Sequence, residues 1–289
     1  MTLQGFGFAP LPSFSPGRPS GRFAPLPAGS GSGGDFSGGA PLVKVCGVRT
    51  PEIAVAVAHA GADLIGVNFA QVSKRRVDLQ TARQIAEALT PGRQTWRNGS
   101  PSPVATGEGL GRGPLREGQA WGPLSLVGIF VEQSADQIAA IASEVGLDAV
   151  QLSGDCTPTA CAEASLASGL PVIAVMRLGA ADDLARATAL AQATGVAAVL
   201  VDAPNTVGGA GHAWDHSQAR PVVGALGLIG IPVIVAGGLN QGNVRAALES
   251  SAARGVDVAS GVETDAMTDP ELVRDFVRAA HARRTPGNG

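Results

Sequence analysis

Short hydrophobic segments alternate with longer amphipathic segments along most of the chain. Each short segment is a nearly continuous run of Val, Ile, Leu and Ala, which is typical of a strand buried on both faces of a sheet. Each longer segment is rich in Ala and Leu at helical spacing. The predicted strands span 43–46, 64–69, 126–131, 149–152, 172–176, 198–201, 233–236 and 256–260. Helices are predicted from near Thr50, Asp78, Ser134, Thr157, Ala181, Asp215, Asn240 and Asp269.

Strict alternation of strands and helices predicts a parallel sheet covered by helices, because parallel neighbours need crossover connections. Eight such units close most economically into a (β/α)8 barrel. An open doubly wound sheet is the alternative, but no G-x-G-x-x-G sequence follows the first predicted strand. Local signals support individual helix starts: Thr50-Pro51-Glu52 supplies a cap residue, a first-turn proline and an acid in order.

Glycine and proline, with 40 and 20 residues, concentrate in two segments of the chain. Residues 1–41 and 91–124 show neither the strand nor the helix periodicity, so they cannot bury enough apolar surface to become ordered. We expect one barrel domain over 42–285, preceded by a disordered extension at 1–41 and followed by a tail at 286–289. Residues 91–124 are predicted to be a low-complexity insertion between the second helix and the third strand. It would enter at the amino-terminal end of the barrel, away from the catalytic end.

The first 41 residues do not read as a secretory signal, because Pro and Gly interrupt every apolar stretch. A transit peptide is also disfavoured, since the segment has no amphipathic period. A disordered extension or a start codon placed too early fits better. No apolar run approaches the length of a membrane span, so we expect a cytoplasmic protein without a membrane partner.

Charge and cysteine content exclude several classes of protein. The 21 basic and 24 acidic side chains leave a formal net charge of −3, which argues against a nucleic-acid partner. Three cysteines are too few for a disulfide scaffold, and an odd number cannot all pair within one chain. Cys156 and Cys161 are assigned to packing or surface positions, and the four histidines show no ligand spacing. We therefore expect no metal site.

In (β/α)8 barrels the chemistry lies at the carboxyl ends of the strands. Cys46 ends the first predicted strand before Gly47, so its side chain is expected at the barrel mouth. A buried structural cysteine is the alternative. Arg49, Arg75 or Arg76 could lower the pKa of the Cys46 thiol and hold some thiolate.

Asp202 follows the sixth apolar run, where a carboxylate is either a turn cap or a site acid. An acid and a thiolate on one barrel mouth suit an isomerase, which needs a proton donor and a proton acceptor. The basic run 74–76 would ordinarily be a solvated face. In the loop after the second strand, one of its arginines could hold a substrate carboxylate.

Glycines follow the last three predicted strands, where barrels commonly hold phosphate. Gly237, Gly238 and Gly261 lack side chains, so backbone N–H groups there can approach an anion closely. The glycine-rich segment 208–211 could form a further wall of the same site. Ordinary turn glycines are the alternative for any one of these positions.

Seven segments carry a recognisable combination of motifs. They read Val43-Lys-Val-Cys-Gly-Val-Arg-Thr50, Gly61-Ala-Asp-Leu-Ile-Gly66, Ser73-Lys-Arg-Arg-Val77, Val127-Gly-Ile-Phe-Val131, Asp148-Ala-Val-Gln-Leu152, Ala236-Gly-Gly-Leu-Asn240 and Val256-Asp-Val-Ala-Ser-Gly-Val-Glu263. Together they resemble phosphoribosylanthranilate isomerase, the single-domain (β/α)8 enzyme of tryptophan biosynthesis. The similarity covers about residues 42–284 apart from the insertion.

The resemblance implies an Amadori rearrangement of N-(5′-phosphoribosyl)anthranilate without cofactor or metal, in a monomer or a homodimer. Asp202 would be the general acid that opens the ribose ring, and Cys46 the general base that takes the C2′ proton. Arg75 matches the position that holds the anthranilate carboxylate. The phosphate of this small-molecule substrate would be held by the backbone at Gly209, Gly211, Gly237, Gly238, Ser260 and Gly261.

Three departures from the family pattern bear on substrate contacts. Ser153 replaces the usual His after the fourth strand, and His212 replaces a Lys in the glycine-rich loop. His216 stands where a Trp is expected, with Trp214 on the other side of Asp215, and the eighth loop lacks the usual Gly and Lys. These departures leave open a barrel that binds a phosphosugar without converting it. The bicyclic isomerase of histidine biosynthesis is disfavoured, because that family has Asp at the position of Cys46.

Overall fold

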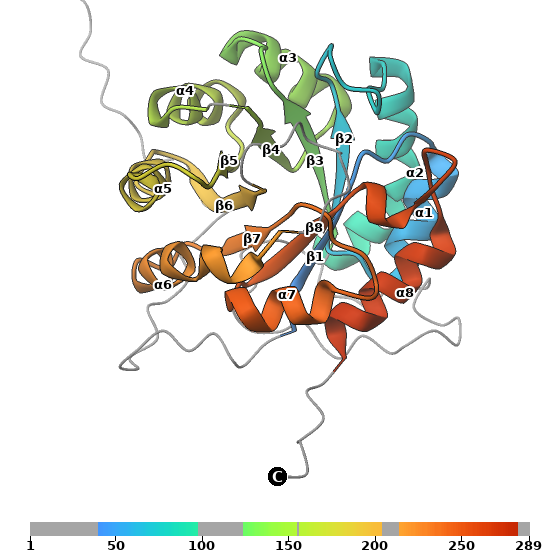
Figure 1. Cartoon of the computed structure of the whole chain (residues 1–289). Helices are drawn as coiled ribbons and strands as arrows, with labels where there is room; N and C mark the ends of the chain where they lie inside the picture. Colours follow the sequence, from blue (N-terminus) through green and yellow to red (C-terminus); the bar gives the residue numbers. More distant parts are fainter. Residues whose placement is uncertain (1–39, 98–123, 155, 204–213, 283–289) are drawn as a thin grey trace, which may run out of the picture.

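Eight parallel strands form a closed barrel in which β1 pairs with β8. The computed structural model describes residues 40–97, 124–154, 156–203 and 214–282. Figure 1 shows the strands at the centre and the helices in a ring around them. The predicted (β/α)8 fold is therefore confirmed. The strands are β1 Leu42–Cys46, β2 Leu64–Asn68, β3 Ser125–Phe130, β4 Ala149–Leu152, β5 Val172–Arg177, β6 Val196–Asp202, β7 Val233–Val235 and β8 Gly255–Val258.

One α-helix follows each strand and covers the outer face of the barrel (Figure 1). Local caps begin several of them: Thr50 Oγ1 accepts from the N–H of Ile53, and Ser134 forms a reciprocal capping box with Gln137. The helices are α1 Pro51–Ala60, α2 Leu79–Arg97, α3 Ala135–Val145, α4 Pro158–Ser168, α5 Asp183–Ala191, α6 Arg220–Leu228, α7 Val244–Ser251 and α8 Pro270–His281. Among these described helices, none has the length and hydrophobicity needed to cross a bilayer.

The strands bury both of their faces in separate apolar layers. Along β1, Val43 and Val45 pack outward against the helices, whereas Leu42 faces the barrel interior. Because side chains alternate along a strand, Lys44 and Cys46 share the interior face with Leu42. The same alternation places Asp202 on the interior face at the end of β6, since Ala198 and Leu200 belong to the interior layer.

The second helix is longer than the sequence predicts. It continues to Arg97, although the insertion is predicted to begin at Pro91. Proline removes one backbone donor, but extending a formed helix requires less free energy than starting one. Most of the predicted extension, most of the predicted insertion and the predicted tail lie outside the described residues.

Two later helices begin after the predicted positions. A 3-10 helix, η2 His216–Ala219, follows Asp215, and α6 starts only at Arg220, where Pro221 suits a first turn. At Asn240 the side chain accepts from the N–H of Gly242, and this local turn delays α7 to Val244.

The end of the eighth strand also differs from the predicted pattern. The strand β8 stops at Val258, and the 3-10 helix η3 Ser260–Val262 follows. A hairpin of β9 Glu263–Thr264 and β10 Met267–Thr268 then leads into α8. Such a short hairpin has too few alternating residues to be visible in the hydrophobic pattern.

We predict that Phe276→Ala destabilises the barrel more than any exposed change on the same helix. The Phe276 side chain is fully buried in α8, which packs against α1. Its removal should lower the free energy of unfolding by about 3–5 kcal/mol, as measured by urea denaturation. Arg274→Ala is the matched control, because Arg274 is exposed on the same helix. Equal effects of the two substitutions would contradict this account of the core.

Candidate active site

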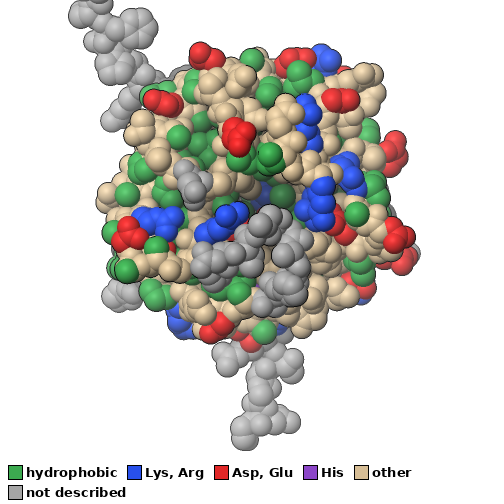
Figure 2. Space-filling view, turned by 45° about the horizontal axis from the view of Figure 1, so that its top comes forward, with side chains coloured by type: hydrophobic (Ala, Val, Ile, Leu, Met, Phe, Trp, Pro, Cys, Tyr) green, Lys and Arg blue, Asp and Glu red, His purple; other side chains and the backbone are tan. Residues whose placement is uncertain are grey.

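Closure of the barrel brings Cys46 and Asp202 to the same rim. Cys46 is the last residue of β1 and Asp202 the last of β6, and both are partly exposed. One oxygen of Asp202 accepts from the N–H of Ala203 at 2.8 Å, which orients the carboxylate. Figure 2 is turned toward this end of the barrel and shows Lys and Arg side chains around a central hollow. An acid and a thiol therefore face one opening, as the sequence predicts.

The Cys46 thiol is a weaker acid than the sequence predicts. Burial raises its pKa to about 11, against the lowering effect of Lys44 and, to a smaller extent, of Arg75. Of the three arginines expected to lower the pKa of this thiol, Arg75 does so, but its effect is smaller than that of burial, so the free protein holds little thiolate. Desolvation of a thiolate inside the barrel outweighs the neighbouring positive charges. The cation with the largest effect on the thiol is Lys44, which comes from the same strand.

Lys44 and Asp257 form an ion pair inside the barrel that the sequence analysis missed. Nζ of Lys44 lies 2.8 Å from Oδ1 of Asp257, and the lysine side chain is fully buried. The two residues are register partners across β1 and β8. The available signal was one charged residue within each of two otherwise apolar strands, because such residues are rarely buried unless they are paired.

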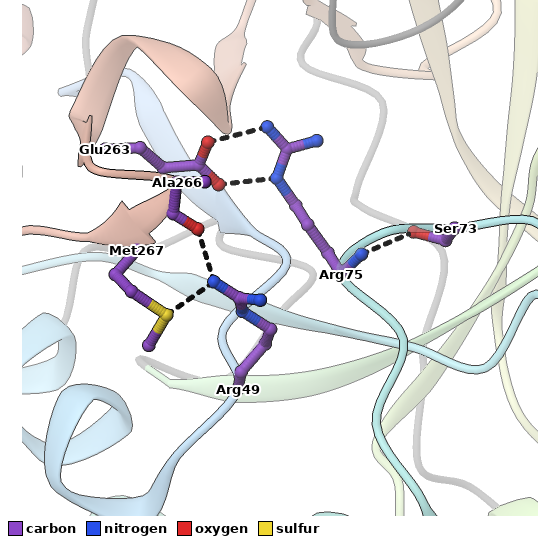
Figure 3. Close-up of polar contacts among 6 residues, drawn as sticks. All are labelled: Arg49, Ser73, Arg75, Glu263, Ala266 and Met267. Carbon is purple, nitrogen blue, oxygen red and sulfur yellow. Dashed lines mark hydrogen bonds and ion pairs between the residues drawn. The ribbon is translucent and has the colours of Figure 1, made fainter.

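Arg75 reaches the barrel mouth from the loop after β2, and it already binds a carboxylate. Its Nε and Nη2 contact the two oxygens of Glu263 at 2.5 and 2.8 Å (Figure 3). Among the described residues, Nη1 of Arg75 has no hydrogen-bond partner. A Cβ atom at Gly47 would lie 2.3 Å from Cδ of Arg75, so glycine leaves room for the arginine beside Cys46.

Glu263 is a second residue of this site that sequence reasoning did not assign. It begins the β9–β10 hairpin, and Arg49 contacts the carbonyl of Ala266 and the sulfur of Met267 in the same hairpin (Figure 3). The hydrogen bonds from Arg75 lower the pKa of the Glu263 carboxyl. Two arginines that the sequence places near the thiol therefore also hold the hairpin.

The loops after β7 and β8 meet where the sequence predicts phosphate binding. Gly237 and Gly238 adopt positive φ angles of 91° and 66°. Among the described residues, their N–H groups donate to no backbone carbonyl. A Cβ atom at Gly261 would lie 1.7 Å from the carbonyl oxygen of Leu239, so this glycine allows the two loops to touch. Ser260 begins the adjoining 3-10 helix. Gly209 and Gly211 lie outside the described residues.

Comparison with known proteins decides which family this barrel belongs to. The family model described as "N-(5'phosphoribosyl)anthranilate (PRA) isomerase" matches residues 115–279. A phosphoribosylanthranilate isomerase of Myxococcus xanthus is 37% identical over 240 residues, covering 82% of this chain and 95% of that protein. The chain belongs to the phosphoribosylanthranilate isomerase family. The predicted family is thereby confirmed.

Further relatives agree in sequence and in structure. A multifunctional tryptophan biosynthesis protein of Phycomyces blakesleeanus is 35% identical, covering 82% of this chain and 32% of that protein. The phosphoribosylanthranilate isomerase of Thermotoga maritima superposes with a TM-score of 0.63 at 26% identity, covering 83% of this chain and 98% of the other. The enzyme from Thermus thermophilus has a TM-score of 0.61 at 26% identity, covering 82% and 97%.

Two of the departures from the family pattern support the end of β7. The buried His216 lies with Nε2 3.1 Å from the carbonyl oxygen of Gly237, and burial lowers its pKa. Trp214 donates from Nε1 to the carbonyl of Ala236 at 2.8 Å and packs against the His216 ring. The two side chains thus hold the loop that carries Gly237. His212 lies outside the described residues.

The departure at Ser153, the residue after β4, also makes a contact within the protein. Ser153 Oγ accepts from Nε2 of the buried Gln151 at 3.0 Å. The two remaining cysteines lie where the sequence predicts. Cys161 is buried in the outer layer, and Cys156 is partly buried and donates to the carbonyl of Val175.

We predict that Glu263→Gln destabilises the protein at neutral pH more than in acid. The folded-state pKa of Glu263 is lowered, so its contribution is present above the unfolded value near 4.5 and is lost as the pH falls through the folded value. Urea denaturation at pH 7, 5 and 3.5 should show a wild-type advantage that shrinks with acid. Glu132→Gln, at an exposed position, is the control. A constant difference at all three pH values would contradict the assignment.

Proposed function

We propose that this protein catalyses the Amadori rearrangement of N-(5′-phosphoribosyl)anthranilate to 1-(2-carboxyphenylamino)-1-deoxyribulose 5-phosphate. The reaction is an intramolecular aldose–ketose isomerisation that needs a proton donor, a proton acceptor and no electron carrier. The observation that carries the proposal is the meeting of Asp202 and Cys46 on one barrel rim in a chain of this family. A related structure contains reduced 1-(o-carboxyphenylamino)-1-deoxyribulose 5-phosphate, which supports this substrate class.

Asp202 is the proposed general acid. Its carboxyl group protonates the ring oxygen of the ribose, the C1′–O bond breaks, and the nitrogen lone pair forms an iminium ion. Gly237 lies directly beside the acid, because a Cβ atom there would come within 3.1 Å of Oδ1 of Asp202. The absence of a side chain at this position lets the loop after β7 pack against Ala203 and Trp214 next to the carboxylate.

Cys46 is the proposed general base. Its thiolate takes the proton from C2′, and the electron pair of that bond forms the enolamine, which tautomerises to the ketone. A thiol with a pKa of about 11 is mostly neutral at pH 7, so little thiolate is present in the free protein. The iminium cation favours the thiolate beside it, and a thiolate of high pKa is a strong base once it forms.

Arg75 is the proposed anchor of the anthranilate carboxylate. Glu263 holds its guanidinium group through Nε and Nη2, which leaves Nη1 for the substrate. Gly47 brings the arginine stem over the end of β1, so the anchored ring lies close to the Cys46 thiol. Because the guanidinium group is already oriented, substrate binding orders fewer rotatable bonds.

The phosphate is proposed to bind the backbone at the ends of β7 and β8. The N–H groups of Gly237 and Gly238, which donate to no backbone carbonyl among the described residues, favour an anion, as does the start of η3 at Ser260 and Gly261. Gly209 and Gly211 complete the proposed set from sequence alone. The cytoplasmic location and the homodimer stay predictions, although one related structure is of monomers derived from a dimeric Thermotoga maritima enzyme.

We predict that Cys46→Ser and Asp202→Asn each lower kcat at least about 100-fold, the lower end of what general acid–base groups contribute. The reaction is followed by the fluorescence of the anthranilate group with purified protein. Cys156→Ser is the matched control, since this cysteine lies outside the proposed site and should leave kcat within about twofold. If Cys46→Ser stays within a few-fold of wild type, Cys46 is not the base.

We predict that Arg75→Lys raises KM more than it lowers kcat. Lysine keeps the charge but loses the planar fork that binds Glu263 and a second carboxylate together. The rise in KM should disappear with a substrate analogue that lacks the ring carboxylate. An equal KM effect on both compounds would place Arg75 elsewhere in the site.

Complementation separates catalysis from binding. Full-length protein should restore growth of a tryptophan-requiring bacterial strain that lacks its own phosphoribosylanthranilate isomerase, and the Asp202→Asn variant should not. Failure of the wild-type protein, with folded protein present in the cells, would favour a barrel that binds the phosphosugar without converting it.

A further inference from the structure

The Lys44–Asp257 ion pair has no place in the proton steps described above. It lies inside the barrel, where its apolar surroundings include Leu42 and Ile234. Removing two charges from water is unfavourable by several kcal/mol, and apolar residues of similar volume often serve stability equally well. Stability alone therefore does not explain the ion pair, which lies near the reactive thiol.

The ammonium group of Lys44 lies close to Cys46. The two residues are two positions apart on one strand, so both point into the barrel. Gly66 of β2 is the register partner of Cys46. A Cβ atom at Gly66 would lie 3.2 Å from Cα of Cys46 and 3.3 Å from Nζ of Lys44. Glycine at this position thus leaves the space in which the lysine extends toward the thiol.

Three charged groups act on the sulfur, each from a different element, and a fourth acts on one of these three. Lys44 of β1 interacts with both Asp257 and the Cys46 thiol, and it lowers the thiol pKa. Asp257 of β8 raises that pKa, and Arg75 from the loop after β2 lowers it. Asp202 of β6 interacts in turn with Asp257. The proposed acid and the proposed base therefore both interact with this buried carboxylate.

We propose that Lys44, held by Asp257, is a positioning residue for the isomerisation: its ammonium group orients the Cys46 sulfur and stabilises the thiolate that takes the C2′ proton. This inference rests on the proposed role of Cys46. Asp257 keeps the buried lysine charged and limits its pull on the sulfur. The ammonium group therefore stabilises the thiolate without making it too weak a base to take the proton.

The test compares two substitutions in the ion pair that should change the reactivity of the Cys46 thiol in opposite directions. Lys44→Met removes the positive charge at similar volume, whereas Asp257→Asn removes the negative charge and keeps the shape. The probe is iodoacetamide, which alkylates thiolates, and mass spectrometry of the Cys46 peptide between pH 7 and 10.5 compares the thiolate fraction of wild type and variants. The Cys156 peptide of the same protein is the internal reference, because the pair does not contact it.

Lys44→Met should slow alkylation of Cys46 about tenfold at pH 8, which corresponds to a pKa rise of one unit. Asp257→Asn should accelerate it, because the unbalanced lysine then pairs with the thiolate. Reactivity of Cys156 should stay unchanged in both. In the activity assay Lys44→Met should lower kcat about tenfold with KM within about twofold, and move the acid limb of the kcat profile to higher pH.

The double variant Lys44→Met/Asp257→Asn protects the test against loss of folding, because it leaves no unpaired buried charge. Its Cys46 should still react more slowly than that of wild type, since Lys44 has the larger of the two effects. Superposable Cys46 alkylation profiles in wild type, Lys44→Met and the double variant would overturn the inference while leaving Cys46 as the base. An active Cys46→Ser variant would instead overturn the proposed function, whatever the alkylation profiles show.

Discussion

Closure of the sheet is the constraint on which the other features depend. Every central strand of a parallel sheet needs a hydrogen-bonded neighbour on each side, and here β1 and β8 provide the last pair. This pairing joins the first and last strands of the chain and aligns Lys44 with Asp257. It also sets the height at which Cys46 meets the loops after β6, β7 and β8. The rim that carries Cys46 and Asp202 exists only because the barrel is closed.

The interior of the barrel is closely packed, so the site depends on positions that lack side chains. Gly47 leaves room for the Arg75 stem, and Gly66 leaves room for the Lys44 ammonium group. Gly237 and Gly261 allow the loops after β7 and β8 to approach the acid and each other. These glycines therefore have steric roles at the reactive end.

Charge balance on the rim differs from what neighbouring residues in the sequence suggest. Three arginines close to the first two strand ends predict an activated thiol. In the structure, Arg75 is bound to Glu263, Arg49 holds the hairpin, and Lys44 is balanced by Asp257. Arg75 and Lys44 are thus already paired with carboxylates, and burial raises the thiol pKa.

The sequence by itself determined the order of strands and helices, the barrel and the residues at strand ends. These features follow from local periodicity, capping residues such as Thr50 and Ser134, and the rule that parallel strands end on one rim. Tertiary structure alone decided the partners of Arg75 and Lys44, and with them the acidity of Cys46. Their partners lie 188 and 213 residues away along the chain, and burial reverses the effect expected from nearby charges. Local sequence patterns predict neither the partners of these side chains nor the acidity of the thiol, because both depend on which distant strands become neighbours.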